Sequence, residues 1–182
     1  MKGIIHWIML FSSSLILIFA SCKKEGTGID SLPGATQEGR QTFGCMINGI
    51  AFKTKGVLFH GPGLDLAYQP AYGIYDFYLN ADRKKNDRIL GVQINSEDIK
   101  LEAGMTIPLV DSKNGKASAS FHDYGNLVFK DYNTNDQIKG ELIITHLDSV
   151  KRIVSGTFWF DAVDDTGEIA EVREGRFDLL FH

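Results

Sequence analysis

The sequence predicts an all-β domain, either an antiparallel sandwich of jelly-roll type or a closed or partly open barrel, preceded by a signal helix and a flexible tether. From residue 42 onward, apolar and polar residues alternate with a period of two, as in strands with one buried face. Turn signals such as Asn48-Gly49 interrupt this alternation at short intervals. No amphipathic helical pattern follows the N-terminal apolar segment, so the strands must bury their apolar faces against one another.

The first 21 residues have the three-part plan of a secretory signal peptide. Lys2 supplies the positive charge, an apolar run follows, and small residues close the segment at Ala20 and Ser21. An uncleaved membrane anchor is the alternative, but the run from residue 4 to residue 20 is short for a span, which needs about 20 apolar residues. Either way, we expect the folded part to lie outside the cytoplasm on a membrane.

The segment Phe19-Ala20-Ser21-Cys22 resembles the lipobox of bacterial lipoproteins. The resemblance implies that the signal peptide is removed, that the thiol of Cys22 is lipidated and that its amino group is acylated, typically with palmitate. It implies anchoring to the outer membrane, on either the cell surface or the periplasmic face. The membrane is therefore one expected partner, reached through the lipid on Cys22.

Residues 22–41 follow as the lipidated cysteine and a tether, because they contain glycines and Pro33 but no hydrophobic periodicity. Asp30-Ser31-Leu32 resembles a three-residue O-glycosylation site of Bacteroidota, which makes Ser31 a candidate for modification. Residues 42–182 are then expected to form a single all-β domain.

The alternation within this domain predicts a series of strands joined by turns. Cys45 lies on the apolar face of the first hairpin and is expected to be a small buried residue. Asp82 to Asp87 is expected to be a solvated hairpin loop, in which Arg83-Lys84-Lys85 is balanced by acids. The expected strands are 42–47, 50–53, 64–69, 72–81, 88–95, 106–110, 116–124, 127–132, 139–148, 152–163, 169–173 and 176–181.

Several of these segments together resemble a family of small, lipid-anchored β domains of Bacteroidota whose function is uncharacterised. The resemblance rests on Gly140-Glu141-Leu142-Ile143-Ile144-Thr145, Ser155-Gly156-Thr157-Phe158-Trp159-Phe160 and Gly175-Arg176-Phe177-Asp178-Leu179, with Phe43-Gly44-Cys45 and Asn48-Gly49 near the start. It implies a compartment and a fold class but no catalytic or binding residue.

Composition limits the partners. The chain of 182 residues has a formal net charge of -4 and no basic stripe, which argues against nucleic acid as a partner. If Cys22 is lipidated, Cys45 is left alone and no intrachain disulfide can form. The core must then stabilise the fold unaided.

One candidate ligand platform emerges from the alternation of the last strands. Phe158 and Phe160 face inward, which places Trp159 on the opposite face beside polar residues. An aromatic ring surrounded by hydrogen-bonding groups is suited to a sugar, which is apolar on its face and hydroxylated at its rim. The alternative is a cross-strand pair that merely covers the sheet. The candidate platform consists of Thr157, Trp159, Asp161, Arg176 and Asp178.

The acidic turn from Asp161 to Glu168 is a second, weaker candidate site. Its oxygen ligands suit calcium, although the spacing does not match an EF-hand and a hairpin turn explains it equally well. The candidate calcium ligands are Asp161, Asp164, Asp165 and Glu168.

No catalytic constellation is visible in the sequence. Ser118, Ser120 and His122 share a face, but no nucleophile elbow and no metal-type histidine pairing accompanies them. We therefore expect no enzyme activity and no cofactor. The leading hypothesis is a lipid-anchored module that binds a glycan or an envelope protein; the alternatives are a structural component of an envelope complex and a barrel that holds a small apolar ligand.

Overall fold

The computed structural model describes residues 28–182, apart from 56–62, 72, 112–116 and 126. These residues form one antiparallel sheet and a short 3-10 helix, which confirms the predicted all-β class. The elements are η2 (Ile29–Ser31), β1 (Thr42–Ile47), β2 (Ile50–Lys55), β3 (Leu64–Ala71), β4 (Ile74–Lys85), β5 (Arg88–Ser96), β6 (Thr106–Leu109), β7 (Ala117–Gly125), β8 (Val128–Asn133), β9 (Gly140–Asp148), β10 (Ile153–Val163) and β11 (Ile169–Leu180).

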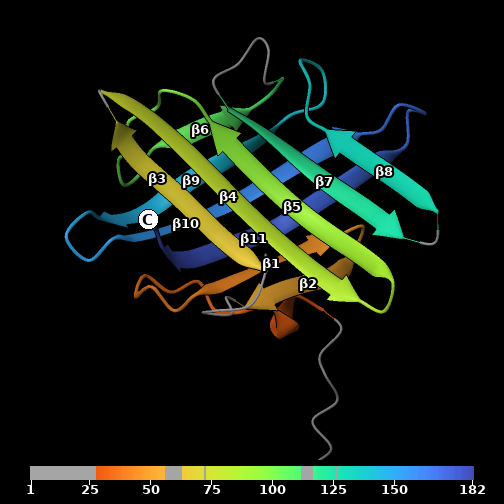
Figure 1. Ribbon diagram of the computed structural model, residues 1–182, viewed down its shortest axis with the longest axis horizontal. Helices are drawn as coiled ribbons and strands as arrows, with labels where there is room; N and C mark the ends of the chain where they lie inside the picture. The colour runs from red at the N-terminus through yellow and green to blue at the C-terminus, as the bar shows by residue number, and fades with distance from the viewer. Residues whose placement is uncertain (1–27, 56–62, 72, 112–116, 126) are drawn as a thin grey trace, which may run out of the picture.

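The sheet curves into a nearly closed barrel. Its strand order is β2-β1-β11-β10-β8-β7-β5-β4-β3, with β9 and β6 branching from β10. The two ends of this order approach the rest of the sheet: the Thr54 hydroxyl on β2 donates to the carbonyl of Asp82 on β4, and the Tyr68 amide on β3 donates to the carbonyl of His182. Figure 1 shows the layer of β3, β4, β5, β7 and β8 crossing in front of β9, β10 and β11. Closure in this manner reduces the exposed strand edges.

Alternate residues of every long strand fill the interior of the barrel. Phe43 stacks on Phe158 with 5.4 Å between ring centroids and meets Phe52 edge-on at 6.1 Å. Each of these rings is almost completely buried, and burying one such side chain contributes about 1.5–3 kcal/mol. Cys45 is fully buried among them, as predicted, and desolvation raises the pKa of its thiol. This places the thiol among hydrophobic residues rather than at a reactive site.

Two local features of the chain position the sites described below. Asn48 and Gly49 adopt φ values of 48° and 76°, which confirms the predicted tight hairpin between β1 and β2. The predicted break between strands 169–173 and 176–181 is wrong, because β11 runs through both. A bulge there leaves Trp159 without a direct partner on β11, since Phe158 pairs with Gly175 and Phe160 with Val172.

The predicted tether is shorter than expected. Leu32 is buried, and Pro33 packs so closely on Gly44 that a Cβ there would lie 2.6 Å from the proline Cδ. The backbone amides of residues 38–40 donate to the carboxylate of Asp178 on β11. From Leu32 on, the segment is therefore part of the folded domain, because a buried acid in the sheet binds its backbone.

The predicted signal peptide, residues 1–21, and the lipidation site Cys22 lie outside the described residues. Within the part of the chain that the structure does describe, no helix has the length and hydrophobicity needed to cross a bilayer.

Candidate functional site

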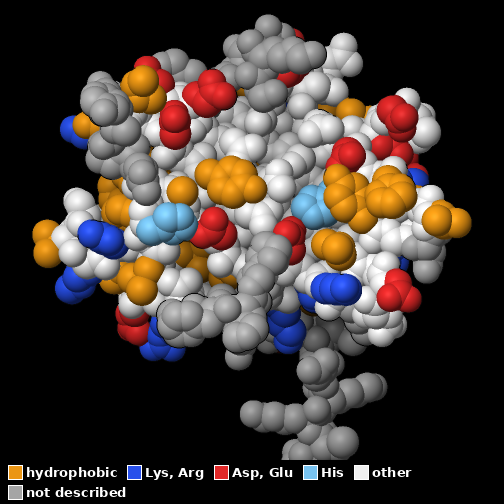
Figure 2. Space-filling view, viewed as in Figure 1, with side chains coloured by type: hydrophobic (Ala, Val, Ile, Leu, Met, Phe, Trp, Pro, Cys, Tyr) orange, Lys and Arg blue, Asp and Glu red, His pale blue; other side chains and the backbone are white. Residues whose placement is uncertain are grey.

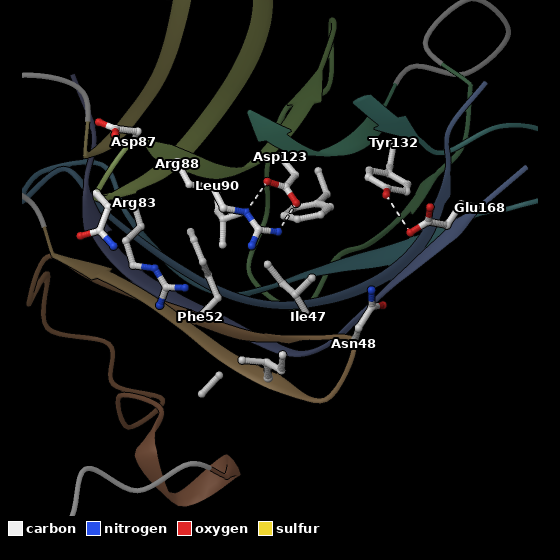
Figure 3. Close-up of a pocket in the computed structure, with 14 residues that line it drawn as sticks. Ile47, Asn48, Phe52, Arg83, Asp87, Arg88, Leu90, Asp123, Tyr132 and Glu168 are labelled. Carbon is white, nitrogen blue, oxygen red and sulfur yellow. Dashed lines mark hydrogen bonds and ion pairs between the residues drawn. The ribbon is translucent and has the colours of Figure 1, made fainter. Parts of the chain in front are cut away.

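A cavity of about 680 Å³ opens at one end of the barrel, between the β1–β2 hairpin and the ends of β4, β5, β7 and β8. Figure 3 shows its two walls, with Arg83 and Arg88 on one side and Ile47 and Phe52 on the other. Ligand sites in proteins are concavities of this size that combine apolar walls with a few polar groups. The lining residues are Ile47, Asn48, Ile50, Ala51, Phe52, Arg83, Asn86, Asp87, Arg88, Leu90, Phe121, Asp123, Tyr132 and Glu168.

Arg83 is the unusual residue of this cavity. It follows Phe77, Leu79 and Ala81 on the inward face of β4, so the alternation that builds the core continues into a cation. Its guanidinium carbon lies 4.9 Å from the centroid of the Phe52 ring. Its Nε is buried, and none of the described residues forms a hydrogen bond with it. The side chain therefore keeps a buried donor available at the apolar wall.

The other cation of the cavity wall is paired. Arg88 donates from Nε to Oδ1 of Asp123 at 2.6 Å and from a terminal nitrogen to Oδ2, which is the two-pronged geometry of a strong guanidinium–carboxylate pair. This pairing distinguishes Arg88 from Arg83.

At the opposite rim, Glu168 accepts hydrogen bonds from Lys130 and from the Tyr132 hydroxyl. These hydrogen bonds, led by that of Lys130, hold the pKa of Glu168 below its usual range. Glu168 therefore stays ionised and is satisfied by its neighbours.

The predicted platform is only partly assembled. Trp159 is 38% exposed, and its indole nitrogen donates to Glu141 at 3.3 Å. The guanidinium carbon of Arg173 lies 5.6 Å from the centroid of its ring. Thr157 and Arg176, which pair directly across β10 and β11, line a groove of about 470 Å³ with Trp159. Three of the five predicted residues thus share one shallow site.

Asp178 does not belong to this platform. It is 1% exposed, and its carboxylate accepts hydrogen bonds from the Thr36 hydroxyl, the backbone amides of residues 38–40 and the Ser155 hydroxyl. Burial alone would raise the pKa of Asp178, but these hydrogen bonds together lower it below its usual value. The prediction of an exposed acid is wrong because a segment distant in sequence covers that part of the sheet.

Asp161 does not line the groove beside Trp159, but it forms an ion pair with an arginine that does. One of its carboxylate oxygens lies 2.6 Å from Nη2 of Arg173. The same arginine stacks on Trp159, so Asp161 orients the cation that covers the tryptophan ring.

The four candidate calcium ligands do not converge. One oxygen of Asp164 accepts hydrogen bonds from the Thr166 amide, the Thr166 hydroxyl and the Glu168 amide, at 2.8–2.9 Å. Asp164 thereby caps the β10–β11 turn, while Asp165 is exposed to solvent. No cluster of three or more metal-type ligands occurs among the residues with described positions. The acidic turn is explained by its own hydrogen bonds.

Ser31, the candidate glycosylation site, lies half-buried in η2, where its hydroxyl donates to the carbonyl of Gly28 at 2.7 Å. Its modification stays a prediction.

Sequence reasoning missed Arg83 because residues 82–87 were predicted to be a solvated loop. In the structure, β4 continues to Lys85, and only the turn at Asn86 leaves the sheet. The signal was present: the inward positions of β4 occur at every second residue, and the next inward position is Arg83. The position of Arg83 in this alternation therefore indicated that its charged side chain faces inward.

No curated protein and no solved structure matches this chain. Residues 77–179, from β4 to the end of β11, match the domain of unknown function DUF6252. This match includes Arg83, Arg88, Tyr132 and Glu168 of the cavity, whereas the β1–β2 hairpin that completes it precedes the matched region. Since the match spans more than half of the sequence, the chain belongs to the DUF6252 family.

Proposed function

We propose that this protein is a lipid-anchored, extracytoplasmic binding protein of the outer membrane, and that its β domain binds a small amphipathic molecule in the cavity at the barrel end without catalysing a reaction. The observation that carries the proposal is Arg83, whose buried Nε has no hydrogen-bond partner among the described residues and whose guanidinium lies over Phe52. A buried donor of this kind favours a ligand that brings an acceptor, ideally a carboxylate.

The apolar wall supports an amphipathic ligand over a fully polar one. Phe52 and Phe121 are buried, and Leu90 and Ile47 continue the same surface inside the cavity. A ligand whose hydrocarbon part contacts these side chains and whose anionic group reaches Arg83 would satisfy both halves of the site.

The test uses a small aromatic anion, 8-anilinonaphthalene-1-sulfonate, and a soluble protein of residues 23–182, which contains all the described strands. We expect its fluorescence to rise on binding and to fall again when decanoate displaces it. Arg83→Met should weaken binding about tenfold, as expected for a lost charge-assisted hydrogen bond. Arg40→Met is the matched control, because Arg40 is exposed and lies outside the cavity. Equal binding by Arg83→Met and the parent protein would contradict the proposal.

Anchoring needs a separate test, because Cys22 is outside the described residues. We expect the full chain to incorporate radiolabelled palmitate and to fractionate with the outer membrane. Cys22→Ser should abolish both. A Cys22→Ser protein that stays labelled would overturn the lipoprotein assignment.

A glycan, or the surface of an envelope protein, bound at the Trp159 groove is the second candidate. The groove brings Trp159, Thr157 and Arg176 together, and the tryptophan is partly exposed. Apart from Trp7 in the predicted signal peptide, Trp159 is the chain's sole tryptophan. Its emission should therefore shift when a glycan of the envelope binds there. Emission unchanged across a glycan panel would leave the barrel cavity as the better candidate.

A further inference from the structure

A second groove, of about 560 Å³, lies on the outer face of β4, β5, β7 and β8, opposite to the face that lines the barrel. Strand register places Asp82, Gly91, His122 and Asp131 in one row across these four strands. The neighbouring row contains Asn80, Gln93, Ser120 and Asn133. Two adjacent rows of polar side chains on a sheet form an extended hydrogen-bonding surface.

In the first row, a glycine allows the side chains on its two sides to meet. Nε2 of His122 lies 3.2 Å from a carboxylate oxygen of Asp82, although β5 separates their strands. They meet because Gly91 has no side chain: a Cβ there would lie 2.1 Å from Nε2 of His122 and 2.2 Å from Asp82 Oδ1. Asn80 donates to the other carboxylate oxygen of Asp82 at 3.0 Å. The floor of the groove is therefore a fixed carboxylate–imidazole pair.

Next to this pair on β4, but not among the residues that line the groove, Asn80 has unused acceptor capacity. Asn80 is 6% exposed, and its Oδ1 has no hydrogen-bond partner among the residues that the structure describes. Asp131 and Asn133 are exposed at the far side. With carboxylates at Asp82 and Asp131, the groove favours ligands that donate hydrogen bonds and disfavours anions.

An aromatic edge borders the polar rows. The ring of Tyr124 stacks on His122 at 4.8 Å and lies 5.7 Å from the ring of Phe129. The Tyr124 hydroxyl donates to Asp131, and this hydrogen bond, the main cause, raises the pKa of Tyr124 to about 12. Phe129 is 74% exposed. Figure 2 shows hydrophobic side chains gathered beside a histidine and acidic residues over β7 and β8.

We propose that this groove binds a neutral carbohydrate, with Phe129 packed against the apolar face of a sugar ring and Asp131, Gln93 and Asn133 hydrogen-bonded to its hydroxyls. An exposed aromatic ring next to carboxylate and amide groups matches the two kinds of surface that a sugar presents. The site is independent of the barrel cavity, because it lies on the opposite face of the same strands.

The test uses the full chain in phosphatidylcholine nanodiscs, which avoids detergents with sugar headgroups. Maltotriose, cellotriose, mannotriose and chitotriose serve as neutral probes at up to about 10 mM, a concentration suited to weak carbohydrate binding. Binding is measured by saturation-transfer NMR. We expect at least one of these trisaccharides to bind and trigalacturonate, an acidic probe, to bind about tenfold more weakly.

The variants identify the site. Phe129→Ala should weaken binding about tenfold, since stacking is lost, and Asp131→Asn about fivefold, since a charge-assisted hydrogen bond is lost. Phe129 and Asp131 are exposed, and an unchanged melting temperature would show that both variants fold. Val150→Ala is the control and should leave binding unchanged, because Val150 is an exposed hydrophobic residue outside the groove. Trp159→Ala distinguishes this groove from the one beside Trp159. The inference is overturned if no neutral trisaccharide binds, if Phe129→Ala binds as well as the parent protein, or if Trp159→Ala alone abolishes binding.

Discussion

The outer surfaces around Trp159 and around His122 carry similar side chains, but they differ in how accessible those side chains are. Each places an aromatic ring next to acids and an amide or hydroxyl on neighbouring strands. Around Trp159, Asp178 is buried beneath residues 36–40 and Arg173 stacks on the indole. Around His122, Asp131 and Phe129 stay exposed. The difference teaches that alternation determines which side chains share a face, whereas distant segments determine whether that face is available.

The largest expected effect concerns the covered surface. Asp178→Asn should lower the free energy of unfolding by about 3 kcal/mol, because it removes a buried charge that accepts hydrogen bonds from the N-terminal segment and from Ser155. Asp131→Asn, on the open surface, should cost less than about 1 kcal/mol. Urea unfolding of both variants measures the contrast. Equal effects would show that the two surfaces do not differ as described.

The buried carboxylate of Asp178 also predicts that the stability of the protein depends on pH. Because the pKa of Asp178 in the folded protein lies below its ordinary value of 3.8, its contribution is fully present above that value and is lost as the pH falls through the lower, folded pKa. The stability difference between the parent protein and Asp178→Asn should therefore be constant at neutral pH and shrink below about pH 4. Thermal unfolding across this range measures it. A difference that grows on acidification would contradict the assigned hydrogen bonds.

On the open surface around His122, we expect substitution of Gly91 to have the largest effect on stability. Gly91→Ala should destabilise the protein by about 2 kcal/mol, because the added Cβ overlaps His122 and Asp82. Gly34→Ala is the control, since nothing lies within 4 Å of a Cβ built at that position. Differential scanning calorimetry of both variants gives the comparison. If the two variants melt together, the pairing across β5 is not as close as described.

The parts of the fold that the sequence predicted follow from local chemistry. Asn48-Gly49 defines its hairpin by backbone conformation alone, and the return of strand 88–95 follows from alternation and the preceding turn. The closure between β1 and β11 could not be predicted, because it joins segments more than 120 residues apart. The sequence alone therefore could not distinguish a sandwich from a barrel.

The predictions of the candidate sites were likewise right where they depended on adjacent strands and wrong where they depended on distant segments. Thr157, Trp159 and Arg176 were correctly placed together because they belong to two adjacent strands. Asp178 was misplaced because residues 36–40 reach it from far along the chain. Arg83 was missed because a run of three cations favours a loop, although the register of β4 places it inward.

Arg83 is expected to have the smallest effect on stability. Arg83→Met should change the free energy of unfolding by less than about 1 kcal/mol, because the loss of its contact with Phe52 is offset by removal of a buried donor that has no hydrogen-bond partner among the described residues. Urea unfolding tests this. A loss of several kcal/mol would mean that Arg83 is a structural residue rather than one that awaits a ligand.

The most direct test of the central claim compares two ligands that differ only in the head group. Octanoate and octanol present the same chain to the apolar wall of the cavity, but only octanoate is an anion at neutral pH. Calorimetric titration of residues 23–182 should show octanoate binding about tenfold more tightly, and Arg83→Met should abolish this preference. Equal affinity of the two ligands, or a preference for octanoate that survives Arg83→Met, would contradict the assignment of Arg83 as the anion-binding residue of the cavity.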